Sequence, residues 1–150
     1  MAYSLRQATP RDIGQMAYLI LVWDSELPGF LQMVRGDANA AHKAAEIICG
    51  PGCATWVAEE GDKLIGAIAV NTLTSLFGFH KYGSVIGVMV LPKYRGTKFI
   101  GLRLIKKAME LKEAMGWTWL ELTPWADDVN TQRVLERLGF DEALHTYILR

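Results

Sequence analysis

Apolar residues change their spacing along the chain, and these changes divide it into expected helices and strands. Residues 12–23 carry apolar side chains three or four positions apart, which is the spacing of one face of a helix. Thr9 followed by Pro10 is typical of a helix start, and residues 3–8 precede it as a short expected strand. A second helix is expected over residues 39–48, because the Gly-Pro-Gly sequence at 50–52 is a strong stop signal.

The middle of the chain has the composition of β-strands. Residues 54–60 and 63–73 are rich in β-favouring side chains, and Glu60-Gly61-Asp62 between them suits a hairpin turn. Residues 84–91, SVIGVMVL, are almost continuously apolar, as expected of a central strand covered on both faces. The aromatic residues before this run are expected to end a strand or form a loop.

The last third of the chain alternates between helix and strand patterns. Apolar positions from Ile100 to Met115 lie on one face of a long expected helix, which Gly116 ends. Residues 117–123 have the alternation of a strand, and residues 129–138 have a helical pattern. Residues 142–150 are expected to form a closing strand.

This order of elements, β-α-α-β-β-β-α-β-α-β, predicts one α/β domain over residues 1–150. A strand meander followed by βαβ units implies a mixed α+β sheet with helices on both faces and about six to seven strands. The length of 150 residues and the 51% of hydrophobic residues suffice for one core without disulfides.

Charge and cysteine content argue against several classes of protein. The formal net charge is +0, which disfavours a chain built to bind nucleic acid. No apolar run approaches the length of about 18 residues that spans a bilayer, and no secretory leader is apparent, so we expect a cytoplasmic protein. Cys49 and Cys53 have a poor spacing for zinc and lack further ligands nearby, so no metal site is expected.

The segment after the apolar central strand is basic and leads directly into the long helix. The first N–H groups of a helix lack intrahelical partners and carry partial positive charge, so this junction can bind an anion. Gly96 permits close approach of the backbone, and Thr97 offers a hydroxyl. Arg95 and Lys98, with Lys93 upstream, add positive charge. These features suit a diphosphate; the alternative is an ordinary turn with solvated cations.

Two motifs in this order resemble the GNAT superfamily of acyl-CoA-dependent N-acyltransferases. The first is VMVLPKYRGTKFIGLRLIKKAM, residues 88–109, which is similar to the family's strand, pyrophosphate loop and amphipathic helix. The second is VNTQRVLERLGFDEA, residues 129–143, a short helix that ends in Leu138-Gly139-Phe140. The resemblance covers most of the chain in the order of its elements and is strongest from Val85 to Phe140.

The resemblance implies a GNAT-like fold and transfer of an acetyl group from acetyl-CoA to a primary amine by direct attack. Val88, Met89 and Val90 would contribute main-chain atoms, including an N–H group for the thioester carbonyl. Asn130 would lie near the cofactor. The loop residues implied in cofactor binding are Arg95, Gly96, Thr97, Lys98, Phe99, Ile100 and Gly101.

The chain departs from the family's pattern at three places. The loop from Arg95 to Gly101 is one residue longer than the pattern, and Lys98 or Phe99 stands near the place of the inner glycine. Leu135 occupies the position of the tyrosine that protonates the leaving thiolate in many members, and Asp128 that of the helix-start asparagine. The central strand lacks the glutamate that serves some members as a base.

The sequence does not decide which side chain transfers protons in the reaction. His80 and Tyr82 precede the central strand, and histidine has the unperturbed pKa best suited to this task near neutral pH. Glu121 lies in the following strand, where a carboxylate faces a site or needs a partner. His145 and Tyr147 are further candidates. Each has a purely structural alternative, and a water chain without a dedicated side chain is another.

The acceptor is expected to be a small-molecule or peptide amine. Asp24 and Glu26, between the first two helices, would attract a cationic amine, and solvated loop charges are the alternative. A homodimer is an open expectation. The competing function is a non-catalytic acyl-CoA-binding or interaction module on the same fold, which the missing tyrosine and glutamate favour. Binding of nucleic acid through the basic loop and helix is the third alternative, and the neutral net charge disfavours it.

Overall fold

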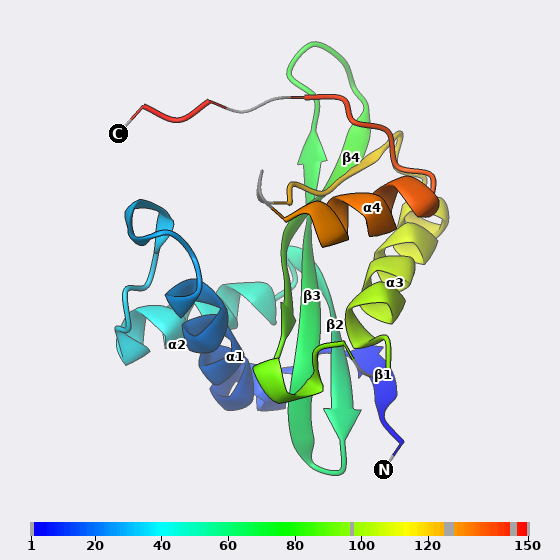
Figure 1. Cartoon of the computed structure of the whole chain (residues 1–150). Coiled ribbons are helices and arrows are strands. Elements are labelled where there is room, and N and C mark those ends of the chain that lie inside the picture. The colour runs from blue at the N-terminus through cyan, green and yellow to red at the C-terminus, as the bar shows by residue number, and fades with distance from the viewer. Residues whose placement is uncertain (1, 97, 125–127, 145–146, 150) are drawn as a thin grey trace.

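The computed structural model describes residues 2–96, 98–124, 128–144 and 147–149. The strands are β1 (Ser4–Gln7), β2 (Cys53–Glu60), β3 (Lys63–Thr74), β4 (Lys81–Val90) and β5 (Leu120–Glu121). The helices are α1 (Ile13–Ser25), α2 (Ala38–Ile48), α3 (Ile100–Met115) and α4 (Val129–Arg137), with short 3-10 helices η1 (Pro10–Asp12), η2 (Gly29–Leu31) and η3 (Pro92–Tyr94). After β1 come two helices, then three consecutive strands, and then α3, β5 and α4, as Figure 1 shows.

The described strands form one mixed sheet in the order β1-β2-β3-β4-β5. Neighbours from β1 to β4 are antiparallel, and β4 and β5 are parallel. The predicted α/β class with a mixed sheet is therefore confirmed, but within the described residues the sheet has five strands where six to seven were expected. Residues 117–123 form only the two-residue β5, and residues 142–144 and 147–149 form no strand. The expected closing strand is therefore wrong for its described residues.

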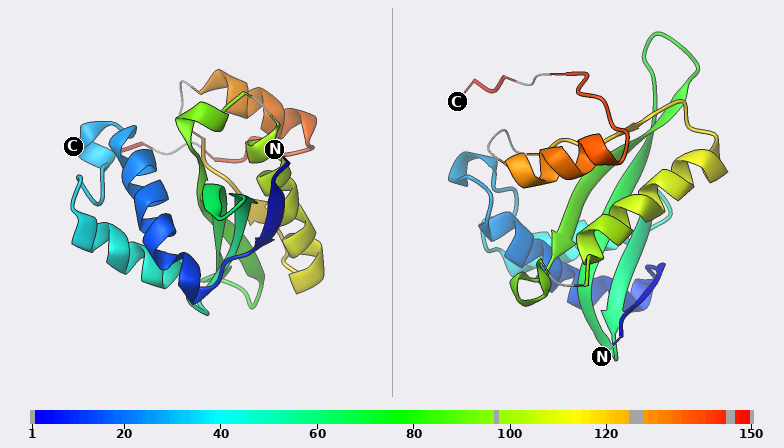
Figure 2. Two further views of the ribbon diagram at one scale, coloured as in Figure 1. Left: turned by 90° about the horizontal axis from the view of Figure 1, so that it is seen from below. Right: turned by 45° about the vertical axis from the view of Figure 1, so that its right-hand side comes forward.

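Helices cover both faces of the sheet and enclose two separate apolar clusters. Helices α1 and α2 pack on one face, around Met16, Leu19 and Ala45. Helices α3 and α4 pack on the other, around Ile100, Leu104 and Leu135. Figures 1 and 2 show the two helix layers on opposite sides of the strands. Strand alternation sends successive side chains of β3 and β4 into the two clusters in turn.

Local signals in the sequence determine where the helices begin and end. The Thr9 hydroxyl and the Asp12 carboxylate form a capping box at η1, and α1 follows directly. The Asp128 carboxylate accepts the N–H of Thr131 at the start of α4. Gly116 ends α3 in the left-handed conformation at φ 65°. The predicted bounds of α3 are confirmed at both ends.

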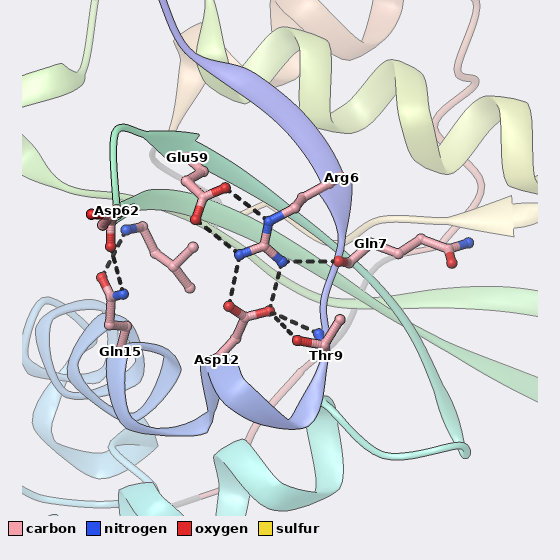
Figure 3. A network of polar contacts seen from close by, with 8 residues as sticks. Arg6, Gln7, Thr9, Asp12, Gln15, Glu59 and Asp62 are labelled. Atoms are coloured by element: carbon pink, nitrogen blue, oxygen red, sulfur yellow. Dashed lines mark hydrogen bonds and ion pairs between the residues drawn. The ribbon is translucent and has the colours of Figure 1, made fainter.

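A network of polar contacts joins β1, β2 and the start of α1 (Figure 3). Nη1 and Nη2 of Arg6 each donate to Asp12 at 2.8 Å, and Nε donates to Glu59 at 2.9 Å. Hydrogen bonding from Arg6 lowers the pKa of the buried Asp12 carboxyl below its ordinary value. In the same view, Gln15 of α1 donates to the carbonyl of Asp62 at 2.9 Å in the β2–β3 turn. These contacts hold α1 in place over the sheet.

Candidate active site

Strands β4 and β5 pair at one end only. Their described pairing consists of Gly83 with Leu120 and Ser84 with Glu121, after which β5 ends and β4 continues to Val90. The β4 edge from Ile86 to Val90 is therefore not paired with a strand on the β5 side within the described part of the chain. The sequence predicted a strand buried on both faces. This prediction is wrong in part, because Val85, Val88 and Val90 are only half-buried.

The backbone groups of Val88 and Val90 face this open edge. The N–H of Leu91 donates to the carbonyl of Ile65 on β3 at 3.0 Å, so Leu91 is hydrogen-bonded toward β3. Residues of an antiparallel strand alternate in this respect, and Val90 and Val88 consequently direct their N–H and C=O groups away from β3. The carbonyl of Val90 confirms this direction, because it accepts from the Arg95 side chain rather than from β3.

A bulge in β4 sits beside this open edge. Ala69 pairs with Gly87 but the next residue of β3, Val70, pairs with Val85, which leaves Ile86 as the extra residue. A Cβ on Gly87 would lie 3.1 Å from the Trp23 ring, so the last turn of α1 packs directly on the bulge. Any larger residue at this position would require the Trp23 ring to shift by a few tenths of an ångström.

The loop before α3 keeps a glycine-like backbone with residues that are not glycine. Gly96, Lys98 and Phe99 have φ angles of 72°, 58° and 53°, all in the left-handed region that favours glycine. Lys98 and Phe99 stand near the place of the missing family glycine, and both adopt the left-handed conformation. Thr97 lies outside the described residues. Phe99 is the N-cap of α3, so the unpartnered N–H groups of the first turn begin at Ile100.

Both of the cations expected to contact phosphate are engaged by carboxylates of other elements. Nη1 and Nη2 of Arg95 lie 2.7 and 2.8 Å from the two oxygens of Glu26. Nζ of Lys98 lies 2.6 Å from Glu60, and this contact lowers the pKa of the half-buried Glu60 carboxyl. The Tyr3 hydroxyl also donates to the carbonyl of Lys98 at 2.7 Å. The interpretation of freely solvated loop cations is thus wrong for these two residues.

The proton-transfer candidates lie at different places relative to the open edge. His80 is exposed in the β3–β4 turn, eight residues before Val88, which corresponds to about 26 Å along a strand. Tyr82 stacks on Trp119 with ring centroids 4.5 Å apart, at the same remote end of β4. Glu121 pairs with Ser84 where β4 and β5 part. Glu121 thus lies at the point where the strands part, Tyr82 lies two residues before Ser84 on the same strand, and His80 lies outside β4.

The face on which Glu121 lies follows from its neighbours. Leu120 and Leu122 pack in the cluster under α3 and α4. Because side chains alternate along a strand, Glu121 points to the α1 side of the sheet, where Trp23 meets the bulge. Among the other candidates, Tyr147 is exposed outside any element, and His145 lies outside the described residues.

The last helix contributes structure rather than a proton donor. Leu135 is 6% exposed and packs in the α3–α4 cluster, so the position of the family tyrosine is filled by a core side chain. Asp128 caps α4, and the exposed Asn130 follows in its first turn. No contact ties Asn130 to the loop before α3 among those described.

The acidic residues at the end of α1 do not form an open site for a cationic amine. Asp24 is 1% exposed, and its carboxylate accepts the N–H groups of residues 33, 34 and 35 at 2.7, 3.2 and 2.9 Å. Glu26 is bound to Arg95. The interpretation of both as acceptor-attracting or solvated charges is therefore corrected: Asp24 shapes the α1–α2 loop, and Glu26 connects it to β4. Sequence reasoning missed these roles, although aspartate near a loop start is a known signal for backbone capping.

Cys49 and Cys53 are free and half-buried, and burial raises the pKa of Cys49 to about 11. No group of three His, Cys, Asp or Glu side chains within the described ranges is placed to hold a metal ion. None of the described helices has the length and apolar character that a bilayer crossing requires.

Comparison with known proteins identifies the class to which this fold and site belong. The model of the acetyltransferase (GNAT) family matches residues 20–140, which is most of the chain. The chain therefore belongs to the GNAT acetyltransferase family, as the two motifs indicated. No curated protein matches the sequence significantly.

Several solved structures share the fold over nearly their whole length. A ribosomal-protein-alanine N-acetyltransferase from Brucella melitensis biovar Abortus 2308 is 18% identical, with a TM-score of 0.74 and 99% of each chain covered. The aminoglycoside N-acetyltransferase AAC(6')-Iy in complex with CoA is 18% identical, with a TM-score of 0.76, covering 99% of this chain and 94% of that one. A transcriptional regulator from Bacillus halodurans C-125 is 21% identical, with a TM-score of 0.77 and 99% of each chain covered. At these identities the likeness concerns the fold.

Proposed function

We propose that this chain transfers an acetyl group from acetyl-CoA to a primary amine by direct attack of the amine. The observation that carries the proposal is the open edge of β4 next to the first turn of α3, where no described strand pairs with Val88 and Val90 on the β5 side. An extended chain carrying amide groups can pair with such an edge, and an anion can bind at such a helix start.

The residues present fit the cofactor mainly through their backbone. Space is available beside Gly96, where an added Cβ would meet nothing within 4 Å. The first-turn N–H groups of Ile100 and Gly101 suit a diphosphate. Val88 and Val90 would hold the pantetheine amides, and an N–H on this edge would polarise the thioester carbonyl. Bound acetyl-CoA would supply the activated acetyl group.

Proton transfer is assigned to Glu121 and solvent. A protonated amine must lose a proton before it attacks, and Glu121 lies where β4 and β5 part, on the α1 side of the sheet. Leu135 is buried and cannot protonate a thiolate, so water takes that role. His80 precedes β4 in an exposed turn and Tyr82 is stacked on Trp119, so we assign neither of them to these steps.

The acceptor class follows from the same geometry and from the relatives. The related structures include acetyltransferases named for aminoglycosides and for a ribosomal-protein alanine, and both substrates present a primary amine. We propose a small-molecule or peptide amine here as well, reaching the β4 bulge from the α1 side. A non-catalytic CoA-binding module is the second candidate, favoured by the leucine at position 135.

Thermal unfolding with added acetyl-CoA tests cofactor binding. A ligand at 100 times its Kd stabilises the native state by about 2.7 kcal/mol, which for a domain of this size raises Tm by about 5–10 °C. Adenosine monophosphate, which lacks the pantetheine arm, is the control and is expected to give a much smaller shift. No shift at millimolar acetyl-CoA would contradict the proposal.

Free-thiol release with a panel of amines separates the two candidate functions. The panel contains neamine, spermidine and a short peptide that begins with alanine. Amine-dependent release that Glu121→Gln lowers at least tenfold supports catalysis as proposed. Tight binding of acetyl-CoA without amine-dependent release would favour the non-catalytic module.

A further inference from the structure

Glu26 and Arg95 form an ion pair between segments that lie far apart in the sequence. Both Nη atoms of Arg95 reach the two carboxylate oxygens of Glu26, at 2.7 and 2.8 Å. The Nε–H of Arg95 donates at the same time to the carbonyl of Val90 at 2.8 Å. The guanidinium is therefore attached both to a carboxylate at the end of α1 and to the last residue of β4.

The charge at the end of α1 favours keeping Arg95 in this place. Glu26 is the C-cap of α1, and no basic residue lies in the last turn of that helix. The C-terminal end of a helix carries partial negative charge, to which the Glu26 carboxylate adds. Arg95 supplies the missing cation from another element. Moving Arg95 to a phosphate would break all three of its bonds and leave Glu26 unpaired at a negative helix end.

The end of α1 is also the part of the molecule that touches the bulge of β4. Trp23 packs on Gly87, and Asp24 holds the backbone of residues 33–35. Glu26 follows these residues directly. One short segment thus contacts the bulge, shapes the α1–α2 loop and is fastened to the end of β4 through Arg95.

We infer that Glu26 is a positioning residue for the proposed reaction: through Arg95 it holds the end of α1 and the α1–α2 loop against β4, and Arg95 is not a ligand of the diphosphate. This inference rests on the proposed function and revises one residue of its expected cofactor site. The side chains of Arg95 and Glu26 are 43% and 41% exposed. Ion pairs this exposed contribute little to folding stability. We therefore expect the Glu26–Arg95 pair to affect the geometry of the site.

The test uses Glu26→Gln, Arg95→Lys, the double variant and the control Glu113→Gln. Gln keeps the size of Glu26 without its charge, and Lys keeps the charge of Arg95 without the two-point contact. Glu113 is an exposed carboxylate paired with Lys112 at 3.2 Å, at the other end of α3. Amide hydrogen exchange of residues 26–37 is measured with and without CoA, and the Kd of CoA is measured by calorimetry.

We expect exchange of residues 26–37 to be at least fivefold faster in E26Q and in R95K, with no further increase in the double variant. CoA is expected to slow exchange in this loop in the wild type, and to slow it at least twofold less in E26Q. The Kd of CoA should stay within threefold of the wild type in all variants. E113Q should match the wild type throughout.

Two results would overturn the inference. A Kd more than threefold tighter in E26Q, or more than threefold weaker in R95K, would mean that Arg95 binds the diphosphate and that Glu26 competes for it. Unchanged exchange in E26Q would mean that the pair positions nothing. Failure of the wild type to bind CoA would instead remove the proposed function, while exchange without ligand still tests the ion pair.

Discussion

Replacement of Phe99 by glycine tests whether the loop before α3 stores backbone strain. Phe99 has φ 53° and ψ 35° as the N-cap of α3, a left-handed conformation that costs an L-residue about 1–2 kcal/mol. Its side chain is 75% exposed, so little packing is lost with it. Glycine adopts this conformation without the steric cost.

The expected gain is the difference between two terms. Glycine relieves about 1–2 kcal/mol of strain but loses about 0.5–1 kcal/mol more conformational entropy on folding than alanine does. Phe99→Gly should therefore be more stable than Phe99→Ala by about 0.5–1 kcal/mol, or about 1–4 °C in Tm. Comparison with alanine removes the contribution of the ring, because both variants lack it.

Urea and thermal unfolding of the two variants at pH 7 measure this difference. Phe99 is preferable to Lys98 for the purpose, because Lys98 also contacts Glu60 and accepts from Tyr3. Equal stability of the two variants, or a less stable glycine variant, would show that the native backbone at this residue is not left-handed. The explanation of the missing family glycine would then fail.

Two further predictions concern the framework. Asp12→Asn should lower the free energy of unfolding at pH 7 by about 2 kcal/mol, since it weakens charge-assisted hydrogen bonds, whereas the exposed Asp141→Asn should not. The bound guanidinium lowers the folded pKa of Asp12, so the stability advantage of the wild type over Asp12→Asn persists above about pH 4 and disappears as pH falls through that pKa. Urea unfolding from pH 7 to pH 3 measures this difference in stability. A difference that widens on acidification would contradict the assignment. Gly83→Ala would place a Cβ 2.4 Å from the Trp117 ring and should destabilise the chain by about 1–3 kcal/mol. Gly14→Ala in α1, where the added Cβ would meet nothing within 4 Å, should stabilise the chain by about 0.5–1 kcal/mol. A fully stable Gly83→Ala protein would show that the Trp117 ring moves freely.

Sequence patterns predicted most elements because their causes are local. Helical spacing, the proline after Thr9 and the glycine at 116 act within a few residues, and α1 and α3 lie where these signals placed them. The junction of β4 with α3 was recognised for the same reason. Residues 142–144 and 147–149, the described part of the predicted closing strand, form no strand.

The candidate site was only partly predictable. The chain order indicated that Val88 and Val90 belong to it, yet their outward-facing backbone groups follow from the register of β3 against β4. The roles of His80 and Tyr82 stay predictions: His80 lies in the turn before β4, and Tyr82 stacks on Trp119. Glu121 was one of several equal candidates until the two-residue pairing of β5 placed it where the strands part.

The amino-acid sequence by itself determined the family, the alternation of helices and strands, and the cationic loop at a helix start. Tertiary structure decided what that loop's cations do, because Arg95 and Lys98 meet Glu26 and Glu60, partners 69 and 38 residues away. It also decided where the sheet opens. Such contacts depend on how distant segments are brought together in space, and no local pattern of residues encodes a partner at that separation.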